Sequence, residues 1–491
     1  KKDIDGIEVN LGYGGTDGPN YEETTASIVW GTTSAKSSAS VIIDYFKNTS
    51  LSSDEMGRLG TANQSPYGGE DFRSSRGFPG YFYVDGVKTI DPACPAENAT
   101  SSGSCLFDYG PFGYIAPASE RVGAISQFEY RFDNGITGFL EMAVQHNSSI
   151  AAGAPTPLDE DAGLTVPGSH PNNPFGQYIE IGRYRTVDAG ARQWDIESDT
   201  LRFVAGLKGE INDWSWETAV QKGRSKSLQT GDRSQGWVRT DFLQQEIDAG
   251  NYNPFGGTYN DPAVIDRITT SLVRQGESHM TSFDANISGE AFSFGDDVVM
   301  MAAGIEYREE DVTDTPDDQF QRGLIFGTES VSAAAERDQY AAYVEFSIPL
   351  AENLELQLAG RYDDYSDFGT TTNPKVALRW APTDEITVRG SWAQGFRAPS
   401  LAQVGLGPSQ ESQFFIDNYR CDATGKDCDP LDYNIEFAGN PDLEAEESTN
   451  TNIGIVLTPT DNLILTVDKW EIATENTVGL FGESNHILLD T

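Results

Sequence analysis

The sequence predicts an all-β fold: a transmembrane, antiparallel up-and-down β-barrel with long extracellular loops. Segments of about ten residues that alternate apolar and polar side chains recur along the 491-residue chain, which is the pattern of a spanning β-strand. Short turns and long loops alternate between these segments. The composition agrees, because 50 glycines and an aromatic content of 11% suit many short strands separated by turns.

Fifteen segments carry this alternation and define the expected order of strands. They are residues 4–13, 21–32, 38–48, 119–131, 136–147, 192–210, 214–226, 278–289, 297–309, 339–350, 353–364, 373–381, 385–394, 447–458 and 463–474. Single-chain bacterial barrels have an even number of strands. An odd number therefore leads us to expect only part of a barrel in this chain.

One segment illustrates how the two faces of a strand differ. In residues 353–365, Leu356, Leu358 and Tyr362 share one face, whereas Arg361 lies on the other, because successive side chains point in opposite directions. Charged residues without an apolar layer above them suit a water-filled lumen. Alternation alone fits a soluble β-sandwich or a β-propeller equally well.

The lengths of the connections favour the barrel over these two alternatives. In an up-and-down sheet every second connection lies on the same side, so all tight turns gather at one end and all long loops at the other. Sandwiches add crossover connections and propellers repeat at a fixed period, and we find neither pattern. The long connections are residues 49–118, 148–191, 227–277, 310–338 and 395–446.

The four cysteines form two close pairs, Cys94 with Cys105 and Cys421 with Cys428, and each pair lies in a long polar loop. Local pairs of this kind are typical of disulfides that close loops in an oxidising compartment. A zinc site is disfavoured because the spacing does not match known zinc motifs. Both pairs fall on the same side of the predicted sheet.

The charge and the motifs exclude several functions. A formal net charge of -43 argues against a nucleic-acid partner, which requires a basic surface. No catalytic or nucleotide-binding motif is present, so we do not expect an enzyme. The acidic segments 158–163 and 311–318 could hold a loop Ca²⁺ ion, but they lack EF-hand spacing and solvated loops explain them better. We therefore expect no cofactor.

Aromatic side chains are concentrated in the predicted loops, where a receptor would bind a ligand. The alternative is that these rings pack the loops against one another. The candidate ligand-binding residues are Phe78, Tyr81, Phe82, Tyr83, Tyr114, Tyr252, Phe255, Phe414, Phe415, Tyr419 and Arg420.

Two phrases carry a resemblance to a known family. "RGSWAQGFRAPSLAQV" at 389–404 is followed some forty residues later by "NPDLEAEESTNTNIGI" at 440–455. This pair resembles the signature of the TonB-dependent outer-membrane receptors, and supporting similarities extend over roughly residues 120–475. The resemblance implies a 22-stranded barrel whose lumen is filled by an N-terminal plug. We accordingly expect residues 1–491 to be a barrel domain that is incomplete at both ends, without the plug and about seven C-terminal strands.

The same resemblance implies a location, partners and a function. The location is the bacterial outer membrane, where the protein would contact lipid and lipopolysaccharide. The expected function is uptake of a scarce nutrient, powered by the TonB complex acting through the missing plug region. The cargo would be a small molecule, a siderophore or an oligosaccharide, with cobalamin, haem and peptides also known in the family. A passive porin-like channel and a secreted carbohydrate-binding protein are the alternatives.

Residues of the two phrases are expected to form a structural clamp rather than a catalytic site. In this interpretation Arg397 points into the lumen and pairs with carboxylates of the plug or of the returning segment. The alternative is a solvated arginine. The motif residues of the clamp are Arg397, Pro399, Asn440, Pro441, Glu444, Glu446 and Glu447.

Overall fold

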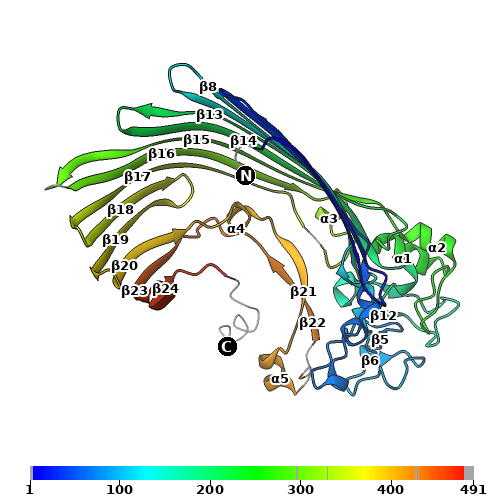
Figure 1. Ribbon diagram of the computed structural model, residues 1–491. Helices are drawn as coiled ribbons and strands as arrows, with labels where there is room; N and C mark the ends of the chain where they lie inside the picture. The colour runs from blue at the N-terminus through cyan, green and yellow to red at the C-terminus, as the bar shows by residue number, and fades with distance from the viewer. Residues whose placement is uncertain (1–3, 295–296, 329, 426–427, 429–430, 480–491) are drawn as a thin grey trace.

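A single curved sheet of fifteen antiparallel strands forms most of the molecule (Figure 1). The computed structural model describes residues 4–294, 297–328, 330–425, 428 and 431–479. Each strand pairs with the strands that precede and follow it in the sheet, with no crossover. The strands of the sheet are β1 (Gly6–Gly15), β2 (Glu22–Thr33), β3 (Ser37–Asn48), β8 (Ser119–Arg131), β9 (Thr137–Gly153), β13 (Arg192–Ile211), β14 (Trp214–Gly231), β15 (Leu272–Phe294), β16 (Asp297–Thr315), β17 (Ala333–Ala351), β18 (Leu354–Tyr365), β19 (Gly369–Thr383), β20 (Ile386–Arg397), β23 (Glu446–Thr460) and β24 (Leu463–Glu475).

All fifteen predicted strands are present in the predicted order, which confirms the fold class. Several strands extend further at the long-loop end than expected. The β14/β15 ladder continues to the pair Gly231 and Leu272, and the β15/β16 ladder reaches Thr315 opposite Gln275. These extensions are polar and lack apolar alternation, which is why sequence patterns missed them. Among the described residues no helix has the length and apolar character needed to cross a membrane.

The two faces of the sheet differ in polarity. The cross-strand row Ile305, Ala342 and Tyr362 is exposed on one face. The opposite face carries buried polar side chains, among them Gln339 and Asp363, which hydrogen-bond to each other. Helix α4 (Leu401–Gly405) packs on β17 on this polar side, and Figure 1 shows α4 inside the curve. The polar face is therefore concave and the apolar face convex.

The long loops at one end of the sheet fold into a compact layer of their own. This loop layer is built from residues 49–118, 154–191, 232–271 and 316–332, and it contains a small five-stranded sheet and two helices that cover it. Its elements are β4 (Leu51–Ser52), β5 (Tyr81–Val84), β6 (Val87–Ile90), β7 (Tyr114–Ala116), β10 (Pro157–Leu158), β11 (Thr165–Val166), β12 (Ile179–Arg185), α1 (Thr240–Asp248), α2 (Pro262–Ile268) and α3 (Asp318–Gln321).

A shared hydrophobic core holds these loops together. Strand β5 lies beside β12, and Phe82 of β5 is fully buried against residues from the other loops. Members of the same core include Leu158, Leu243, Tyr252 and Phe326, so that with Phe82 all four loop segments contribute to it. Burying such side chains contributes roughly 1.5–3 kcal/mol each relative to exposure. The layer is therefore a folded unit rather than a set of solvated loops.

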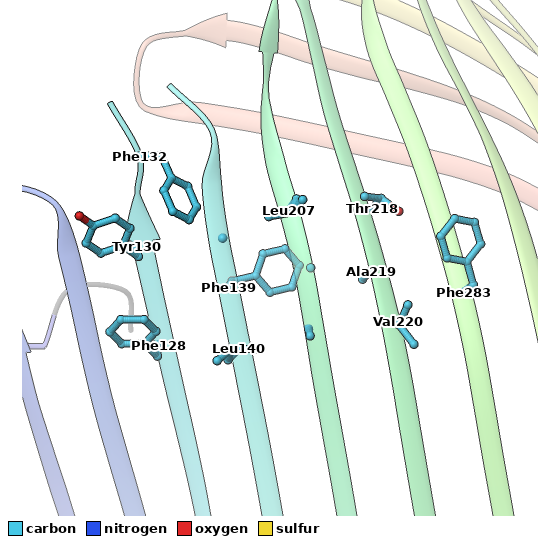
Figure 2. Close-up of a pocket in the computed structure, with 13 residues that line it drawn as sticks. Phe128, Tyr130, Phe132, Phe139, Leu140, Leu207, Thr218, Ala219, Val220 and Phe283 are labelled. Carbon is cyan, nitrogen blue, oxygen red and sulfur yellow. The ribbon is translucent and has the colours of Figure 1, made fainter. Parts of the chain in front are cut away.

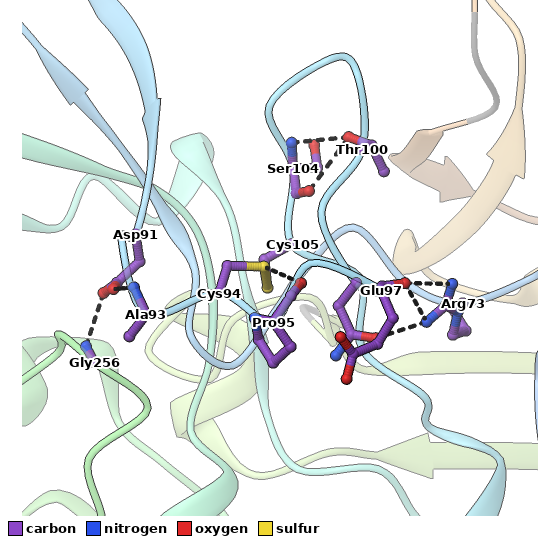
Figure 3. Close-up of a disulfide and its surroundings, with 11 residues drawn as sticks. Arg73, Asp91, Ala93, Cys94, Pro95, Glu97, Thr100, Ser104, Cys105 and Gly256 are labelled. Carbon is purple, nitrogen blue, oxygen red and sulfur yellow. Dashed lines mark hydrogen bonds between the residues drawn. A yellow bond between two sulfur atoms is a disulfide. The ribbon is translucent and has the colours of Figure 1, made fainter.

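Both predicted disulfides are formed. Cys94 is bonded to Cys105 with a Cα–Cα distance of 6.0 Å, and Cys421 is bonded to Cys428 with a distance of 4.8 Å. Figure 3 shows that the first disulfide lies close to Asp91, whose carboxylate accepts from the backbone N–H of Ala93 at 2.8 Å and of Gly256 at 2.7 Å. The closed loop is thus tied to the 232–271 segment.

We expect Phe82→Ala to loosen the loop layer and to leave the barrel intact. Removing this fully buried ring leaves a cavity that costs about 3–5 kcal/mol. Hydrogen exchange on the full-length receptor should show faster exchange at the amides of β5 and β12, with no change in β16 and β17. Tyr178→Ala, which removes a highly exposed ring, is the matched control. Equal protection in the two variants would contradict this account.

Candidate ligand-binding face and its anchors

Four of the predicted ligand-binding aromatics lie in the core of the loop layer. Tyr81, Phe82, Tyr252 and Phe255 are buried, with the rings of Phe82 and Phe255 4.7 Å apart between centroids. A buried ring presents no surface to a ligand, so these four side chains pack the loops against one another, as the alternative interpretation proposed. The sequence could not separate the two roles, because each residue sits in a similar Gly- and Pro-rich stretch.

The other predicted residues are more accessible. Phe78 is half-buried and meets the exposed ring of Tyr259 edge-on at 5.5 Å between centroids. Tyr83 and Tyr114 are half-buried. On the hairpin formed by β21 (Ser409–Phe415) and β22 (Leu431–Phe437), the ring of Phe415 stacks on Tyr433 at 4.5 Å.

The remaining two candidates lie on a short helix that follows the hairpin's first strand. Helix α5 (Asn418–Thr424) carries Tyr419, which is 60% exposed, and Arg420, also exposed. Phe414 belongs to β21, but its side chain lies outside the described part of the structure. Three exposed rings that sequence reasoning did not select are Tyr67, Phe72 and Tyr178. The only sequence signal for them is an aromatic residue near a Gly- or Pro-containing turn.

The β21/β22 hairpin crosses the concave side and meets the loop layer (Figure 1). Asn434 on β22 donates to the Asp159 carboxylate at 3.1 Å and to Asp161 at 3.1 Å, and accepts from Arg76 at 3.1 Å. Arg76 and Asp159 are themselves buried and form an ion pair with a nitrogen–oxygen distance of 2.5 Å. The two charges compensate each other only when the loop layer is folded. Separating them inside the protein would leave a buried charge without its partner, which is strongly destabilising. The hairpin is therefore anchored to a preorganised polar site.

A second polar cluster surrounds Glu160, next to this anchor. Its carboxylate accepts from the hydroxyls of Tyr81 at 2.6 Å and Tyr83 at 3.1 Å, and lies 3.5 Å from the Arg183 guanidinium. Burial pushes the pKa of Glu160 upward, but the charge of Arg183 and the tyrosine hydrogen bonds outweigh it and hold the pKa below its usual value. Burial also raises the pKa of Tyr81 well above the normal tyrosine value.

The two acidic segments considered for calcium are engaged with donors from the chain. In 158–163 the carboxylates bind the arginine, tyrosine and asparagine groups just described. In 311–318, Asp311 lies 3.1 Å from His279 and Asp314 pairs with Arg274 at 2.5 Å. Among the residues that the structure describes, no cluster of three or more His, Cys, Asp or Glu side chains is arranged to hold a metal ion.

Arg397 forms a bidentate ion pair with Glu446, one of the partners considered for it. The two residues face each other across β20 and β23. The Nε and Nη2 groups donate to the two carboxylate oxygens at 2.5 and 2.6 Å. The Val478 backbone N–H donates to the same carboxylate at 2.7 Å. Glu444 and Glu447 are not its partners in the described contacts.

The other residues of the motif fix the path of the chain as it leaves β20. The Pro399 carbonyl accepts from buried Arg337 at 2.7 Å, which also pairs with Asp367. Ser400 then caps α4 in a capping box with Gln403, which satisfies free N–H groups at the helix start. The Asn440 N–H donates to the Gln403 carbonyl at 2.9 Å, and Pro441 follows it in the returning segment. Both phrases of the motif therefore meet at α4.

This architecture, with tight turns at one end and a folded loop layer at the other, is that of an outer-membrane β-barrel. The family model for the TonB dependent receptor-like β-barrel matches residues 145–486. The chain belongs to this family of transport receptors, and it resides in the bacterial outer membrane. The family resemblance inferred from the two phrases is confirmed.

Individual relatives are distant. A probable TonB-dependent siderophore receptor, PirA of Acinetobacter baumannii, is 23% identical over 250 residues, which cover 50% of this chain and 28% of PirA. The iron-regulated outer membrane virulence protein of Vibrio cholerae is 26% identical over 157 residues, covering 32% of this chain and 20% of the relative. The matched segments of this chain thus span less than a third of the length of either relative.

A solved structure shows the same fold. The ferric enterobactin receptor PfeA of Pseudomonas aeruginosa, in a mutant form bound to enterobactin, superimposes with a TM-score of 0.55 at 14% identity. The superposition covers 97% of this chain and 55% of that receptor. It supports the fold alone, because identity at this level does not carry over a ligand.

We expect the loop layer to lose stability in acid because of Glu160. A carboxyl whose pKa is lowered by folding stabilises the folded state above its unfolded pKa of about 4.3, and this contribution is lost as the pH falls through the lower, folded pKa. Protease protection of the loop layer in the full-length receptor should therefore decline below about pH 4. Glu160→Gln should remove part of this pH dependence, and Glu180→Gln, at an exposed position of β12, should not. An identical acid profile in wild type and Glu160→Gln would rule out this role.

Arg397→Ala should free the segment that leaves β20. The bidentate pair with Glu446 is lost, so residues 398–445 should become more sensitive to limited proteolysis while the yield of folded barrel stays close to wild type. Arg397→Lys keeps the charge but cannot reproduce the two parallel hydrogen bonds, and should give an intermediate result. Wild-type protease resistance in Arg397→Ala would exclude the clamp.

Proposed function

We propose that residues 1–491 are the barrel portion of an active outer-membrane receptor that binds a siderophore at its outer loops and imports it. The observation that carries this proposal is the folded loop layer, disulfide-closed and spanned by an anchored hairpin. A passive pore needs only loops that constrict the lumen. A ligand receptor needs fixed rings and polar groups at its mouth, and the loop layer supplies a rigid support for them.

The names of the relatives support the cargo class. One relative is described as a siderophore receptor, another as iron-regulated, and a structural neighbour binds enterobactin. The accessible candidates for ligand contact in this chain are Phe78, Tyr83, Tyr114, Phe415, Tyr419 and Arg420. Aromatic rings and an arginine suit an aromatic, anionic iron complex.

Energy coupling belongs to the same proposal. The TonB complex would act through a plug domain, and the plug would occupy the concave face with its buried polar residues. Outer-membrane lipid and lipopolysaccharide would surround the convex face. The plug-contacting role of the clamp residues, Arg397 and Glu446 first among them, is part of this proposal.

The test is uptake of radioactive iron supplied as ferric enterobactin by cells that express the full-length gene as their sole receptor. We expect uptake in cells with TonB and none in cells without it. Tyr419→Ala should weaken binding by about two- to tenfold, because an aromatic contact contributes about 0.5–1.5 kcal/mol. Tyr340→Ala, at an exposed position on the convex face, is the control. Uptake independent of TonB, with open conductance in planar bilayers, would establish a passive channel instead.

A further inference from the structure

A hollow lies on the convex face of the barrel, away from the loop layer and its candidate ligand-binding residues. It lies across β8, β9, β13, β14 and β15, has a volume of about 520 Å³, and is lined almost entirely by apolar atoms (Figure 2). Figure 2 shows the rings of Phe128, Tyr130 and Phe132 along one side of it, Phe139 in the middle and Phe283 on the other side. No lining residue is charged, and the only side-chain oxygens belong to Tyr130 and Thr218.

The hollow arises from small residues placed between large ones. One cross-strand row runs Phe128, Leu140, Ala205, Val220 and Phe283, with the smallest side chain at its centre. The neighbouring row of the same face crosses the sheet parallel to it, two residue pairs closer to the turns. Its members are Tyr130, Gly138, Leu207 and Thr218.

The floor at Gly138 is covered from one end by an aromatic ring. A side chain at Gly138 would meet Phe132 at 3.3 Å and Leu207 at 3.5 Å. Phe132 also packs edge-on against Tyr130, with centroids 5.1 Å apart. An aromatic side chain over a glycine stabilises such a position in a sheet. The packed rings of Tyr130 and Phe132 therefore form one wall of the hollow. Gly138, which has no side chain, leaves the space next to this wall unfilled.

The row with Ala205 faces outward. It continues through Phe283 to Tyr307 and Tyr340, which lie on the convex face, opposite to the buried Gln339 and Asp363. The intervening row, Glu129, Phe139, Gly206 and Ala219, belongs to the concave face, and its last three members complete the lining of the hollow. On that concave face Lys208 donates to Glu129 at 2.6 Å. The hollow thus opens toward the hydrocarbon of the membrane rather than toward the lumen.

The hollow lies in the half of the barrel near the tight turns. Phe132 precedes the β8/β9 turn, and Phe128 is four residues further into the strand, a span of about 13 Å. Short turns of outer-membrane barrels face the periplasm. The leaflet that contacts this region is therefore the periplasmic one, which is built of phospholipid.

We propose that this hollow binds one acyl chain of a phospholipid from the periplasmic leaflet and retains it as an ordered lipid. Inside a membrane the surrounding chains are as apolar as the protein, so retention depends on close packing rather than on transfer from water. A channel between fixed rings with a floor of glycine and alanine gives an acyl chain contacts on several sides. A flat lipid-facing surface gives contacts on one side only. This inference does not depend on the identity of the cargo.

The test is native mass spectrometry of the full-length receptor, extracted from outer membranes in a mild detergent. We expect the wild type to retain one bound phospholipid, recognised by its mass, after the detergent is removed. Ala205→Phe should lower the retained fraction about fivefold by filling the hollow. Ala342→Phe makes the same change on the convex face beside Ile305 and Tyr362, outside the hollow, and should retain the lipid.

Each other outcome counts against the proposal. Equal retention in wild type and Ala205→Phe would place the lipid elsewhere. An adduct with the mass of lipopolysaccharide or of detergent would identify a different occupant. Wild type without any retained phospholipid would show that the hollow holds no ordered chain. Both variants must give the wild-type β-sheet spectrum in circular dichroism, so that a loss of lipid is not caused by misfolding.

Discussion

Backbone hydrogen bonding in a medium without water is the constraint on which the rest of this structure depends. Inside hydrocarbon an unpaired N–H or C=O group costs several kcal/mol, so strands can cross only as members of a continuous ladder. In the described sheet every strand from β2 to β23 pairs on both edges with its neighbours in order, and β1 and β24 form the two outer edges. Up-and-down connectivity follows, because a crossover would leave a gap in the ladder.

The same constraint separates two kinds of packing. Along the sheet, stability comes from ladders and from contacts such as the Arg361, Asp363 and Glu306 network on the concave face. Beyond the membrane the chain is in water, where apolar burial drives folding. The loop layer therefore has a conventional hydrophobic core around Phe82, Leu243 and Tyr252. One chain thus contains two folding regimes, which meet where the polar ends of β14, β15 and β16 leave the membrane.

The sheet was predictable because its signal is local. Alternation identifies each strand, and the lengths of connections give the side of every loop; both disulfides followed from their positions in those loops. The loop layer was not predictable, because its contacts join distant segments. No local sequence pattern around Phe82 or Tyr252 indicates that the two residues pack in one core. Likewise, no pattern around Asn434 indicates that it contacts Asp159. For Arg397 the motif resemblance left several carboxylates open, among them Glu444, Glu446 and Glu447, and it is the register of β20 and β23 that places Glu446 opposite it.

The bond between Asn434 and Asp159 spans 275 positions of the chain. Contacts so distant in sequence form late, because the entropy of closing the intervening chain is lost before they stabilise anything. Here the intervening chain includes every strand from β13 to β20, so the two groups meet only after that run of the sheet has curved into register. Docking of the hairpin therefore depends on the curvature of the whole sheet. A barrel with one strand out of register would leave the hairpin undocked from the loop layer.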